Sequence, residues 1–216
     1  MQSRRINPVN LVKETLGTTG SVYIPSLIIA SPGFLITLLS KLPVISPILV
    51  TISAIFLSPL LTGANIFYLH RHFSLNSISI EEAFNLSFQN IFKLIFASFV
   101  VLLICIIGLI LFFFPGFYIM YRLLLSIYTI VIEDLFALDG ITRSWQLTKG
   151  NWWSIFLATL LLTIVLFFPL IVLPVLLLSL GIPQQIASIV ANILGFSIGP
   201  FFSVYGYLLY VNLKEN

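Results

Sequence analysis

The chain has 216 residues, of which 59% are hydrophobic and only 8% are charged, and its formal net charge is +3. Soluble domains carry about 25% charged residues, so this chain has too few charges to cover a water-facing surface. Its basic residues form no cluster of the kind that binds nucleic acid, whereas a small positive charge suits an anionic membrane surface. The composition predicts an all-α integral membrane protein, with residues 1–216 forming one polytopic domain.

The N-terminal segment predicts a short amphipathic helix that lies in the membrane interface. Asn7 and Pro8 are typical of a helix start, and Gly17 and Gly20 are expected to end it. The following apolar run is too long for a signal peptide and has no small-residue cleavage site behind it. We therefore expect the N-terminus to be retained.

Six apolar runs predict membrane spans, because about 20 helical residues cross a hydrocarbon core of ~30 Å. Prolines interrupt the first, second, fifth and sixth runs, and Lys41 lies in the turn between the first two. Pro115 and Gly116 predict a tight turn before the fourth run, which is the shortest. The expected spans are residues 21–40, 44–69, 91–114, 117–132, 152–180 and 186–211.

Two further amphipathic helices are expected between the spans. Ser79 and Glu82 predict a capping box at the start of the first of them. In the second, within residues 133–150, Asp139 and Arg143 are spaced to form an ion pair on one helix face. An amphipathic helix followed by a two-span hairpin thus occurs three times, in units of about 7–70, 79–132 and 139–211.

These three units suggest an internal repeat, which leaves two interpretations open. Membrane proteins with a central pathway often contain such repeats, but duplication of a stable hairpin gives the same pattern. The side of the six spans that holds both termini also holds most of the charge, which by the positive-inside rule places both termini in the cytoplasm. The basic residues on that side are Arg4, Arg5, Lys13, Arg71, Lys93, Arg143, Lys149 and Lys214.

One segment resembles a known family. It contains Pro115-Gly116-x-Tyr118, Arg122, Glu133 and the run from Arg143 to Trp153, which reads RSWQLTKGNWW. These residues resemble the membrane domain found with bacterial glycerophosphoryl diester phosphodiesterases, and related uncharacterised multi-span families. The resemblance implies a six-helix module in a bacterial plasma (inner) membrane. It carries over no hydrolase activity, because that activity belongs to a separate barrel domain of about 250 residues.

Gly140 departs from the resembled pattern, which usually has alanine there. We expect this glycine to loosen the start of its helix.

Arg122 is the sharpest candidate site, because a charge within a span costs about 2.5 kcal/mol or more and usually faces the protein interior. It is expected either to bind a lipid phosphate or another anion, or to be satisfied structurally by freed carbonyls or by Glu133 and Asp134. Glu133 is about 16 Å farther along an ideal helix, so a direct bond needs another route.

Aromatic and basic residues near Arg122 offer a second set of candidates. Trp145, Trp152 and Trp153 are typical of the aromatic belt at a membrane interface. A sharper alternative is a headgroup pocket lined by Trp153, Arg143 and Lys149.

No catalytic or metal-binding set accompanies these residues. The carboxylates near Glu133 lack a nucleophile or a metal set. His70 and His72 do not share a helix face, and the single cysteine, Cys105, is expected to be a buried apolar residue.

Small residues recur every four positions in the last span, which predicts close packing against another helix with a right-handed crossing. The expected partner is a row of the second span, Ala54, Ser58 and Thr62, or a second copy of the protein. The small residues are Ala187, Ala191, Gly195, Gly199 and Ser203.

We expect a non-enzymatic module that binds membrane lipids or partner proteins at its cytoplasmic face, without a cofactor or a nucleic-acid partner. The partner is expected to be another membrane protein or a second copy of the chain. The alternative is a transporter or lipid-translocating protein that uses proline-broken helices and Arg122.

Overall fold

The computed structural model describes residues 6–39, 47–74, 77–111 and 113–215, and over these residues it contains ten helices and no strands. Six helical segments are long and apolar enough to cross a membrane. The prediction of an all-α chain is therefore confirmed, and the number of these segments equals the number of predicted spans, whereas Lys41 lies outside the described residues. The helices are α1 (Pro8–Leu39), α2 (Pro47–Phe73), α3 (Ile80–Gln89), α4 (Ile91–Leu111), α5 (Phe113–Arg122), α6 (Ser126–Ile132), α7 (Ala137–Leu147), α8 (Trp152–Ser179), α9 (Gln184–Ser197) and α10 (Gly199–Lys214).

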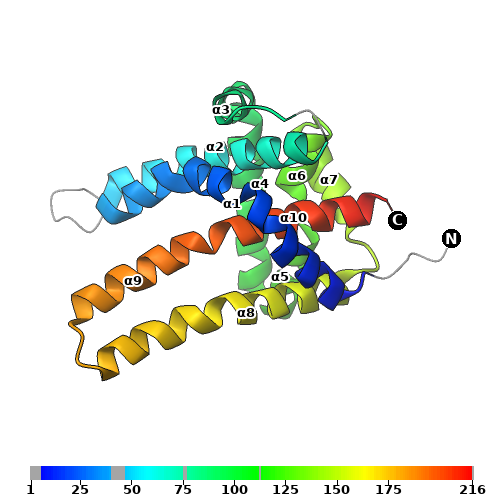
Figure 1. Ribbon diagram of the computed structural model, residues 1–216. Helices are drawn as coiled ribbons and strands as arrows, with labels where there is room; N and C mark the ends of the chain where they lie inside the picture. Colours follow the sequence, from blue (N-terminus) through cyan, green and yellow to red (C-terminus); the bar gives the residue numbers. More distant parts are fainter. Residues whose placement is uncertain (1–5, 40–46, 75–76, 112, 216) are drawn as a thin grey trace.

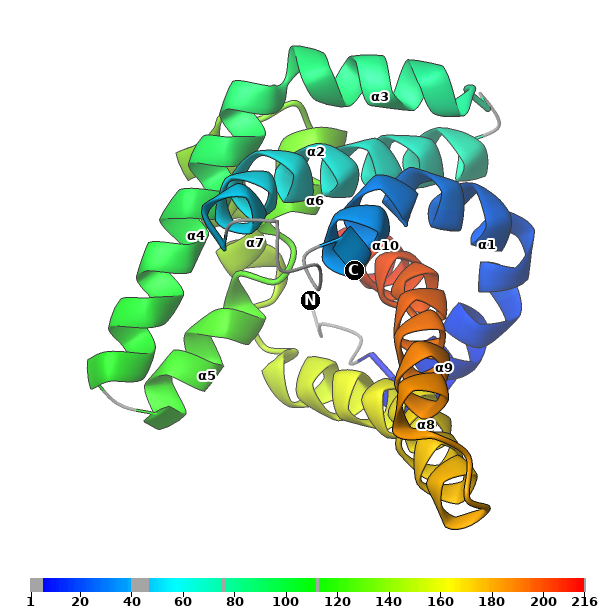
Figure 2. The ribbon, with the colours of Figure 1, turned by 90° about the vertical axis from the view of Figure 1, so that its left-hand side faces the viewer.

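Three helical pairs, α1–α2, α4–α5 and α8–α9, surround the shorter helices α6 and α10 (Figures 1 and 2). In Figure 1, α1, α2, α8 and α9 extend to the left, and both chain ends lie on the right. The α4–α5 pair runs across these helices rather than parallel to them. The two short amphipathic helices α3 and α7 pack against α2 and α6, respectively.

The last helix, α10, lies at the centre of the fold, and every residue from Val204 to Tyr210 is buried. It packs against α1, α2, α6 and α7. The Tyr205 hydroxyl lies 2.8 Å from that of Thr159 in α8, and the Tyr128 hydroxyl of α6 donates to the Ser203 carbonyl at 3.0 Å. Buried hydroxyls with such partners avoid the cost of unsatisfied polar groups in the apolar core.

The N-terminal helix begins where predicted but does not end there. The Asn7 side chain accepts from the backbone N–H of Val9 at 3.0 Å, and Pro8 opens α1. The expected stops at Gly17 and Gly20 are wrong, since α1 continues through both to Leu39. Neither glycine has the positive φ of a helix end, and burial of one face on both sides of them favours a single continuous helix.

The amphipathic helices α3 and α7 are confirmed, with one correction. The Ser79 side chain accepts from the Glu82 N–H, and the Glu82 carboxylate accepts from the Ser79 N–H, which completes the predicted capping box. In α7, however, the predicted pair between Asp139 and Arg143 is not formed. Among the described residues, Arg143 instead pairs with Glu133, which is partly shielded from solvent and so gives a stronger interaction.

The fourth span differs from the prediction in two ways. It is two helices, because the chain leaves helical geometry after Arg122 and resumes it at Ser126. Pro115 and Gly116 do not form the turn but lie within the first turn of α5, where proline is tolerated. A Cβ added at Gly116 would lie 2.7 Å from the Cα of Leu109, so this glycine permits close contact between α4 and α5.

The stripe of small residues does not form one continuous packing surface, so that prediction is wrong. Helix α9 ends at Ser197 and α10 begins at Gly199, and Pro200 lacks the N–H needed to continue the ladder. Within the described chain, a Cβ at Gly199 would have no neighbour within 4 Å, whereas one at Gly195 would touch Leu170 in α8 at 3.8 Å.

Two members of the stripe do lie inside the fold. Ala187 is buried, and Ser203 accepts from Asn65 of α2 at 3.0 Å. The contact with the second span therefore runs through Asn65 rather than through the row of Ser58 and Thr62, and the side chain of Ala54 lies outside the described residues.

We predict opposite effects of alanine at two helical glycines. Gly116→Ala should lower the free energy of unfolding by about 1–3 kcal/mol, because the new Cβ meets the backbone of α4. Gly17→Ala, which meets nothing within 4 Å, should raise it by up to about 1 kcal/mol. Thermal unfolding in detergent measures both, and a Gly116→Ala variant as stable as the native chain would contradict the α4–α5 contact.

Candidate functional site

Arg122 is the last residue of α5, and its backbone is held by α7. Its carbonyl accepts from the Ser144 hydroxyl at 2.9 Å and from the Thr148 hydroxyl at 3.2 Å. Since α5 ends here, this carbonyl lacks a partner in its own helix, and α7 supplies two. The sequence contains Ser144 and Thr148 within the quoted motif, but only the fold brings them to Arg122.

The Arg122 side chain contacts two rings of an aromatic cage, which we define as Tyr118, Trp145 and Trp152. Its guanidinium carbon is 4.6 Å from the ring centroid of Trp145 and 5.8 Å from that of Tyr118. The rings of Tyr118 and Trp152 are in turn 5.6 Å apart. Only 3% of Arg122 is exposed, so the charge is enclosed although it stands near the end of a span.

Two buried donors in this site have no hydrogen-bond partner in the described structure. They are the Nε of Arg122 and the Nε1 of Trp152. A buried N–H without an acceptor costs about 1–3 kcal/mol, and more when the group is charged. Aromatic faces attract a cation, but they do not replace a hydrogen-bond acceptor. The site therefore lacks hydrogen-bond acceptors for these two N–H groups.

The cage is connected to the protein surface. Trp153 contacts Trp152 at 4.7 Å and is 68% exposed. Trp145 is 39% exposed, and its side chain also lines an apolar pocket of about 460 Å³ between α4, α5 and α7. A ligand that reaches Arg122 at the cage thus has apolar surface beside it. The pocket is lined by Ile104, Ile119, Leu123, Ile141, Thr142, Trp145 and Gln146.

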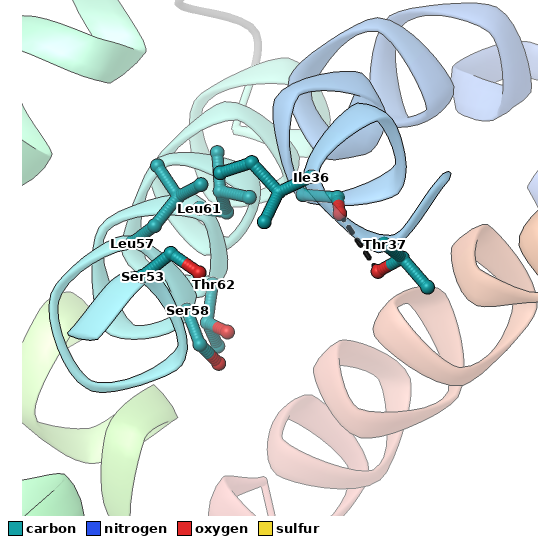
Figure 3. A pocket seen from close by; sticks show the side chains of 8 residues that line it. Ile36, Thr37, Ser53, Leu57, Ser58, Leu61 and Thr62 are labelled. Atoms are coloured by element: carbon teal, nitrogen blue, oxygen red, sulfur yellow. Dashed lines mark hydrogen bonds between the residues drawn. The ribbon is translucent and has the colours of Figure 1, made fainter. Parts of the chain in front are cut away.

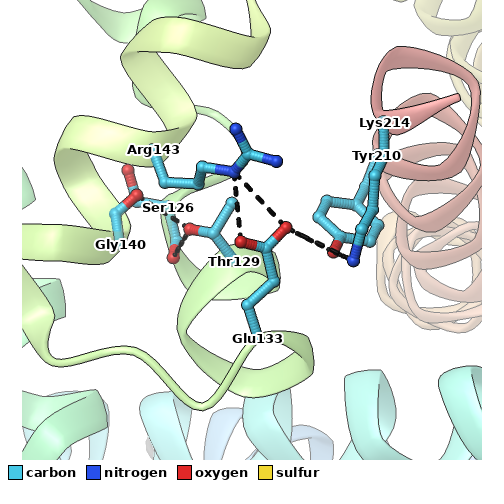
Figure 4. Close-up of polar contacts among 7 residues, drawn as sticks. All are labelled: Ser126, Thr129, Glu133, Gly140, Arg143, Tyr210 and Lys214. Carbon is cyan, nitrogen blue, oxygen red and sulfur yellow. Dashed lines mark hydrogen bonds and ion pairs between the residues drawn. The ribbon is translucent and has the colours of Figure 1, made fainter. Parts of the chain in front are cut away.

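Glu133 is the centre of a separate polar cluster that joins α6, α7 and α10 (Figure 4). It accepts from the Arg143 Nε at 3.1 Å and from the Tyr210 hydroxyl at 2.9 Å. The Lys214 Nζ lies 3.4 Å from the carboxylate and donates to the same Tyr210 hydroxyl. Glu133 therefore neutralises Arg143 and Lys214 and makes no ion pair with Arg122.

The environment of Glu133 favours its ionised form. Partial burial alone raises the pKa of Glu133, but hydrogen bonds from Tyr210 and Arg143 and the charges of Arg143 and Lys214 outweigh it. The result is a pKa below the ordinary value of 4.5. The cluster thus holds a carboxylate rather than a carboxylic acid at neutral pH.

The alternative headgroup pocket of Trp153, Arg143 and Lys149 stays a prediction. No hydrogen bond, ion pair or ring contact joins these three residues in the described part of the chain. Arg143 belongs to the Glu133 cluster, and Lys149 is exposed. Asp134 forms a separate ion pair on the surface, with its carboxylate 2.9 Å from the Lys93 Nζ.

Neither histidine nor the cysteine adds a site. The His70 ring lies tilted beside that of Tyr207, and the His72 ring stacks on that of Tyr68. Over the described residues, no three His, Cys, Asp or Glu side chains gather as metal ligands would. Cys105 lies in α4 and is half-buried.

Gly140 supports the site by close packing, which corrects the expectation that it loosens its helix. A Cβ at this position would overlap the side chain of Ile130. The Gly140 carbonyl also accepts from the Thr129 hydroxyl at 2.8 Å. The glycine lets α7 sit directly on α6, and this brings Ser144 and Thr148 to Arg122.

We predict that Glu133→Gln destabilises the protein and removes part of its acid sensitivity. Because the folded-state pKa is lowered, ionised Glu133 stabilises the fold above pH 4.5, and that stabilisation is lost as the pH falls further. Glu133→Gln should lower the free energy of unfolding by about 1–3 kcal/mol at neutral pH and flatten the loss below pH 4.5. Thermal unfolding against pH measures this, with Glu81→Gln on exposed α3 as control. Equal curves for Glu133→Gln and the native chain would contradict the cluster's role.

Comparisons with known proteins place the chain in a family without assigning it an activity. No curated protein and no solved structure matches it. The family described as Domain of unknown function (DUF7847) matches residues 80–208, from the start of α3 into α10. The match covers the whole aromatic cage and Glu133, leaves out Tyr210 and Lys214, and shows no link to glycerophosphoryl diester phosphodiesterases. More than half of the chain is matched, and the protein belongs to the family described as Domain of unknown function (DUF7847).

Proposed function

We propose that this protein is a non-enzymatic membrane module that binds the phosphate of an anionic lipid with Arg122. The observation that carries the proposal is the buried, unpartnered Nε of Arg122 beside the rings of Trp145 and Tyr118. A second unpartnered donor, Trp152 Nε1, belongs to the ring next to Tyr118. Arginine presents its N–H groups in a planar fork that matches phosphate oxygens. A phosphate oxygen would supply the acceptor that the site lacks.

The charge balance around Arg122 supports an anionic ligand. Among the described residues, none of the ion pairs includes Arg122, because Glu133 pairs with Arg143 and Lys214. Removing a cation from water costs several kcal/mol, whereas a cation–π contact returns about 0.5–2 kcal/mol. The two rings therefore offset only part of the cost, and a bound phosphate offsets more of it.

A lipid is favoured over a soluble phosphate by the surroundings of the cage. Trp153 is largely exposed, as expected of a tryptophan at the level of the headgroups. The apolar pocket beside Trp145 contains no charged side chain among its described lining residues and suits an acyl chain. A molecule with a phosphate and an apolar chain would occupy both parts of the site.

The proposal includes an orientation. Both chain ends lie on the same side of the fold (Figure 1), as an even number of spans requires. With the basic residues on that side, the positive-inside rule places the termini and the cage in the cytoplasmic half of a bacterial plasma membrane. The lipid would then come from the inner leaflet, which is the anionic one in the general case.

The proposal also includes an internal repeat, in which a helix-plus-hairpin unit is duplicated. It further includes a relationship to the phosphodiesterase-associated membrane domains. In α3, the Ser87 hydroxyl donates to the Leu60 carbonyl of α2 at 2.7 Å. Thr148, which follows α7, makes the corresponding contact with Arg122 at the end of α5. Ser87 and Thr148 stand at the same spacing as Asn90 and Asn151, which supports a common origin of the last two units.

Lipid translocation is a second candidate, and it is favoured by the interrupted helices. The breaks lie at residues 123–125 and at Ile198, and Pro200 follows the second break in the first turn of α10. Pro25, Pro32, Pro59, Pro169 and Pro174 lie inside continuous helices. Interrupted spans line the binding sites of many transporters, and the first break directly follows Arg122. Transfer of a fluorescent phospholipid between leaflets of reconstituted vesicles tests this candidate, and an unchanged rate would exclude it.

We predict that Arg122→Leu removes co-purified anionic phospholipid while the protein stays monodisperse in detergent. Loss of a charge-assisted phosphate contact of about 1.5–3 kcal/mol corresponds to a drop in lipid affinity of roughly tenfold or more. Native mass spectrometry after mild delipidation measures the bound lipid. Arg71→Leu makes the same chemical change at an exposed position of α2 and should leave the lipid in place.

Two outcomes separate a binding role from a structural one. Retention of anionic lipid by a well-folded Arg122→Leu variant would contradict the proposal. Aggregation of that variant, together with a folded Arg122→Gln variant that keeps its lipid, would show that Arg122 only supports the fold.

The orientation makes a separate prediction. A cysteine at Ser77, before α3, should be shielded from an impermeant thiol reagent added outside intact cells, because it lies on the cytoplasmic side. A cysteine at Gln184, at the tip of the α8–α9 hairpin, should react. Labelling of Ser77→Cys but not of Gln184→Cys would reverse the orientation.

A further inference from the structure

Two cavities meet on one face of α2, away from the Arg122 site. One, of about 360 Å³, lies between α1 and α2, and the other, of about 350 Å³, extends from α2 to α4 and α6. Both are lined by Ser58 and Thr62, and Figure 3 shows these two hydroxyls pointing to the same side of α2. The two cavities therefore share a hydroxyl-bearing wall within an otherwise apolar span.

The hydroxyls of Ser58 and Thr62 differ from those of several other residues in the spans. Serine and threonine in a membrane helix normally donate to a carbonyl of the preceding turn. Thr15, Thr19 and Thr159 all do so, at 2.6–2.9 Å. In the described chain, Ser58 and Thr62 have no hydrogen-bond partner, and both are exposed.

Pro59 leaves one backbone carbonyl on this face of α2 without its helical hydrogen bond. Proline has no N–H, so it cannot complete the helical bond to the carbonyl four residues earlier, which is that of Ile55. Ile55 and Pro59 line the second cavity together with the two hydroxyls. In a bilayer each such unsatisfied group costs several kcal/mol, so water or a polar solute is expected beside it.

A network of hydrogen-bonded side chains lies beside the two cavities, toward the interior of the fold. Asn65, one turn beyond Thr62, is buried; its side-chain oxygen accepts from Ser26 at 3.0 Å and its amide donates to Ser203 at 3.0 Å. The Ser203 carbonyl accepts in turn from Tyr128. Helices α1, α2, α6 and α10 are thereby joined at one level, which forms a floor below the hydroxyls.

We infer that the two cavities form a hydrated vestibule along α2, with the Asn65 network on its inner side. Its ligands are water and the uncharged, hydroxyl-bearing part of a solute or lipid headgroup. Serine and threonine hydroxyls both donate and accept, which suits a hydroxyl-bearing group. No charged side chain lines either cavity among the described residues, so the vestibule is not a site for a free ion.

The vestibule is independent of the lipid-phosphate site. It is made by α1, α2, α4 and α6, and it shares no lining residue with the aromatic cage. In Figure 1, these parts of α1 and α2 lie toward the left, on the side away from both chain ends. Loss of either site leaves the other intact.

Cysteine accessibility tests the hydration. Ser58→Cys and Thr62→Cys are placed separately in a Cys105→Ala background and reconstituted in lipid nanodiscs, where both faces of the membrane are accessible. A hydrophilic methanethiosulfonate reagent reacts with the thiolate, which forms only where water is present. The control is Phe56→Cys, on the same helix and nearer its start, since Phe56 is 55% exposed but lines neither cavity.

We expect both hydroxyl positions to react about tenfold faster than Phe56→Cys, because only they contact water. Equal, slow labelling at all three positions in a folded, monodisperse protein would overturn the vestibule. If Thr62→Cys does not fold, Ser58→Cys alone decides, since it stands at the shared wall of both cavities. Asn65→Leu should extend labelling to Ser26→Cys by opening the floor, and no labelling at Ser26→Cys there would contradict the role of Asn65.

Protection of Thr62→Cys from labelling distinguishes a free solute from a lipid headgroup as the source of the hydroxyl-bearing ligand. Its labelling rate is divided by that of Ser77→Cys, which is exposed on the surface. A lower ratio with added sorbitol identifies a free hydroxyl-bearing solute. A lower ratio in phosphatidylglycerol nanodiscs than in phosphatidylcholine nanodiscs identifies a headgroup. The same ratio under all three conditions would contradict the assigned ligand class.

Discussion

The buried charge of Arg122 is the constraint on which this structure depends. A guanidinium that is almost fully enclosed must be compensated, and the nearest compensation in this fold is aromatic rather than acidic. Trp145 and Tyr118 cover the cation, while Glu133 serves Arg143 and Lys214 at the junction with α10. This buried cation thus has no carboxylate partner among the described residues, and in the proposed function a lipid phosphate completes its environment.

The scaffold around Arg122 follows from that constraint. The chain stops being helical directly after Arg122, and Ser144 and Thr148 satisfy the carbonyl that the break releases. The close approach of α7 that makes these bonds possible requires glycine at position 140. Helix break, glycine contact and aromatic cage therefore act together, and changing one of them displaces the others.

The sequence predicts the local features of this protein well and the contacts between helices poorly. The cap at Asn7, the capping box at Ser79 and the six apolar spans are local patterns, and the structure contains them. The sequence predicts a helix end at Gly17 and a turn at Gly116, whereas both glycines lie inside helices. Sequence alone does not distinguish a glycine that ends a helix from one inside a helix. The cage and the Asn65 network join distant segments, and nothing in residue spacing reveals which segments meet.

A structure at side-chain resolution, obtained by electron cryomicroscopy in phosphatidylglycerol nanodiscs, tests the central claim most directly. The account predicts phosphate density beside the Nε of Arg122, with the phosphorus about 4 Å from the guanidinium carbon as in a charge-assisted hydrogen bond, and with the headgroup near Trp152. A guanidinium packed between Trp145 and Tyr118, with well-resolved rings and no density beside it, would contradict the account.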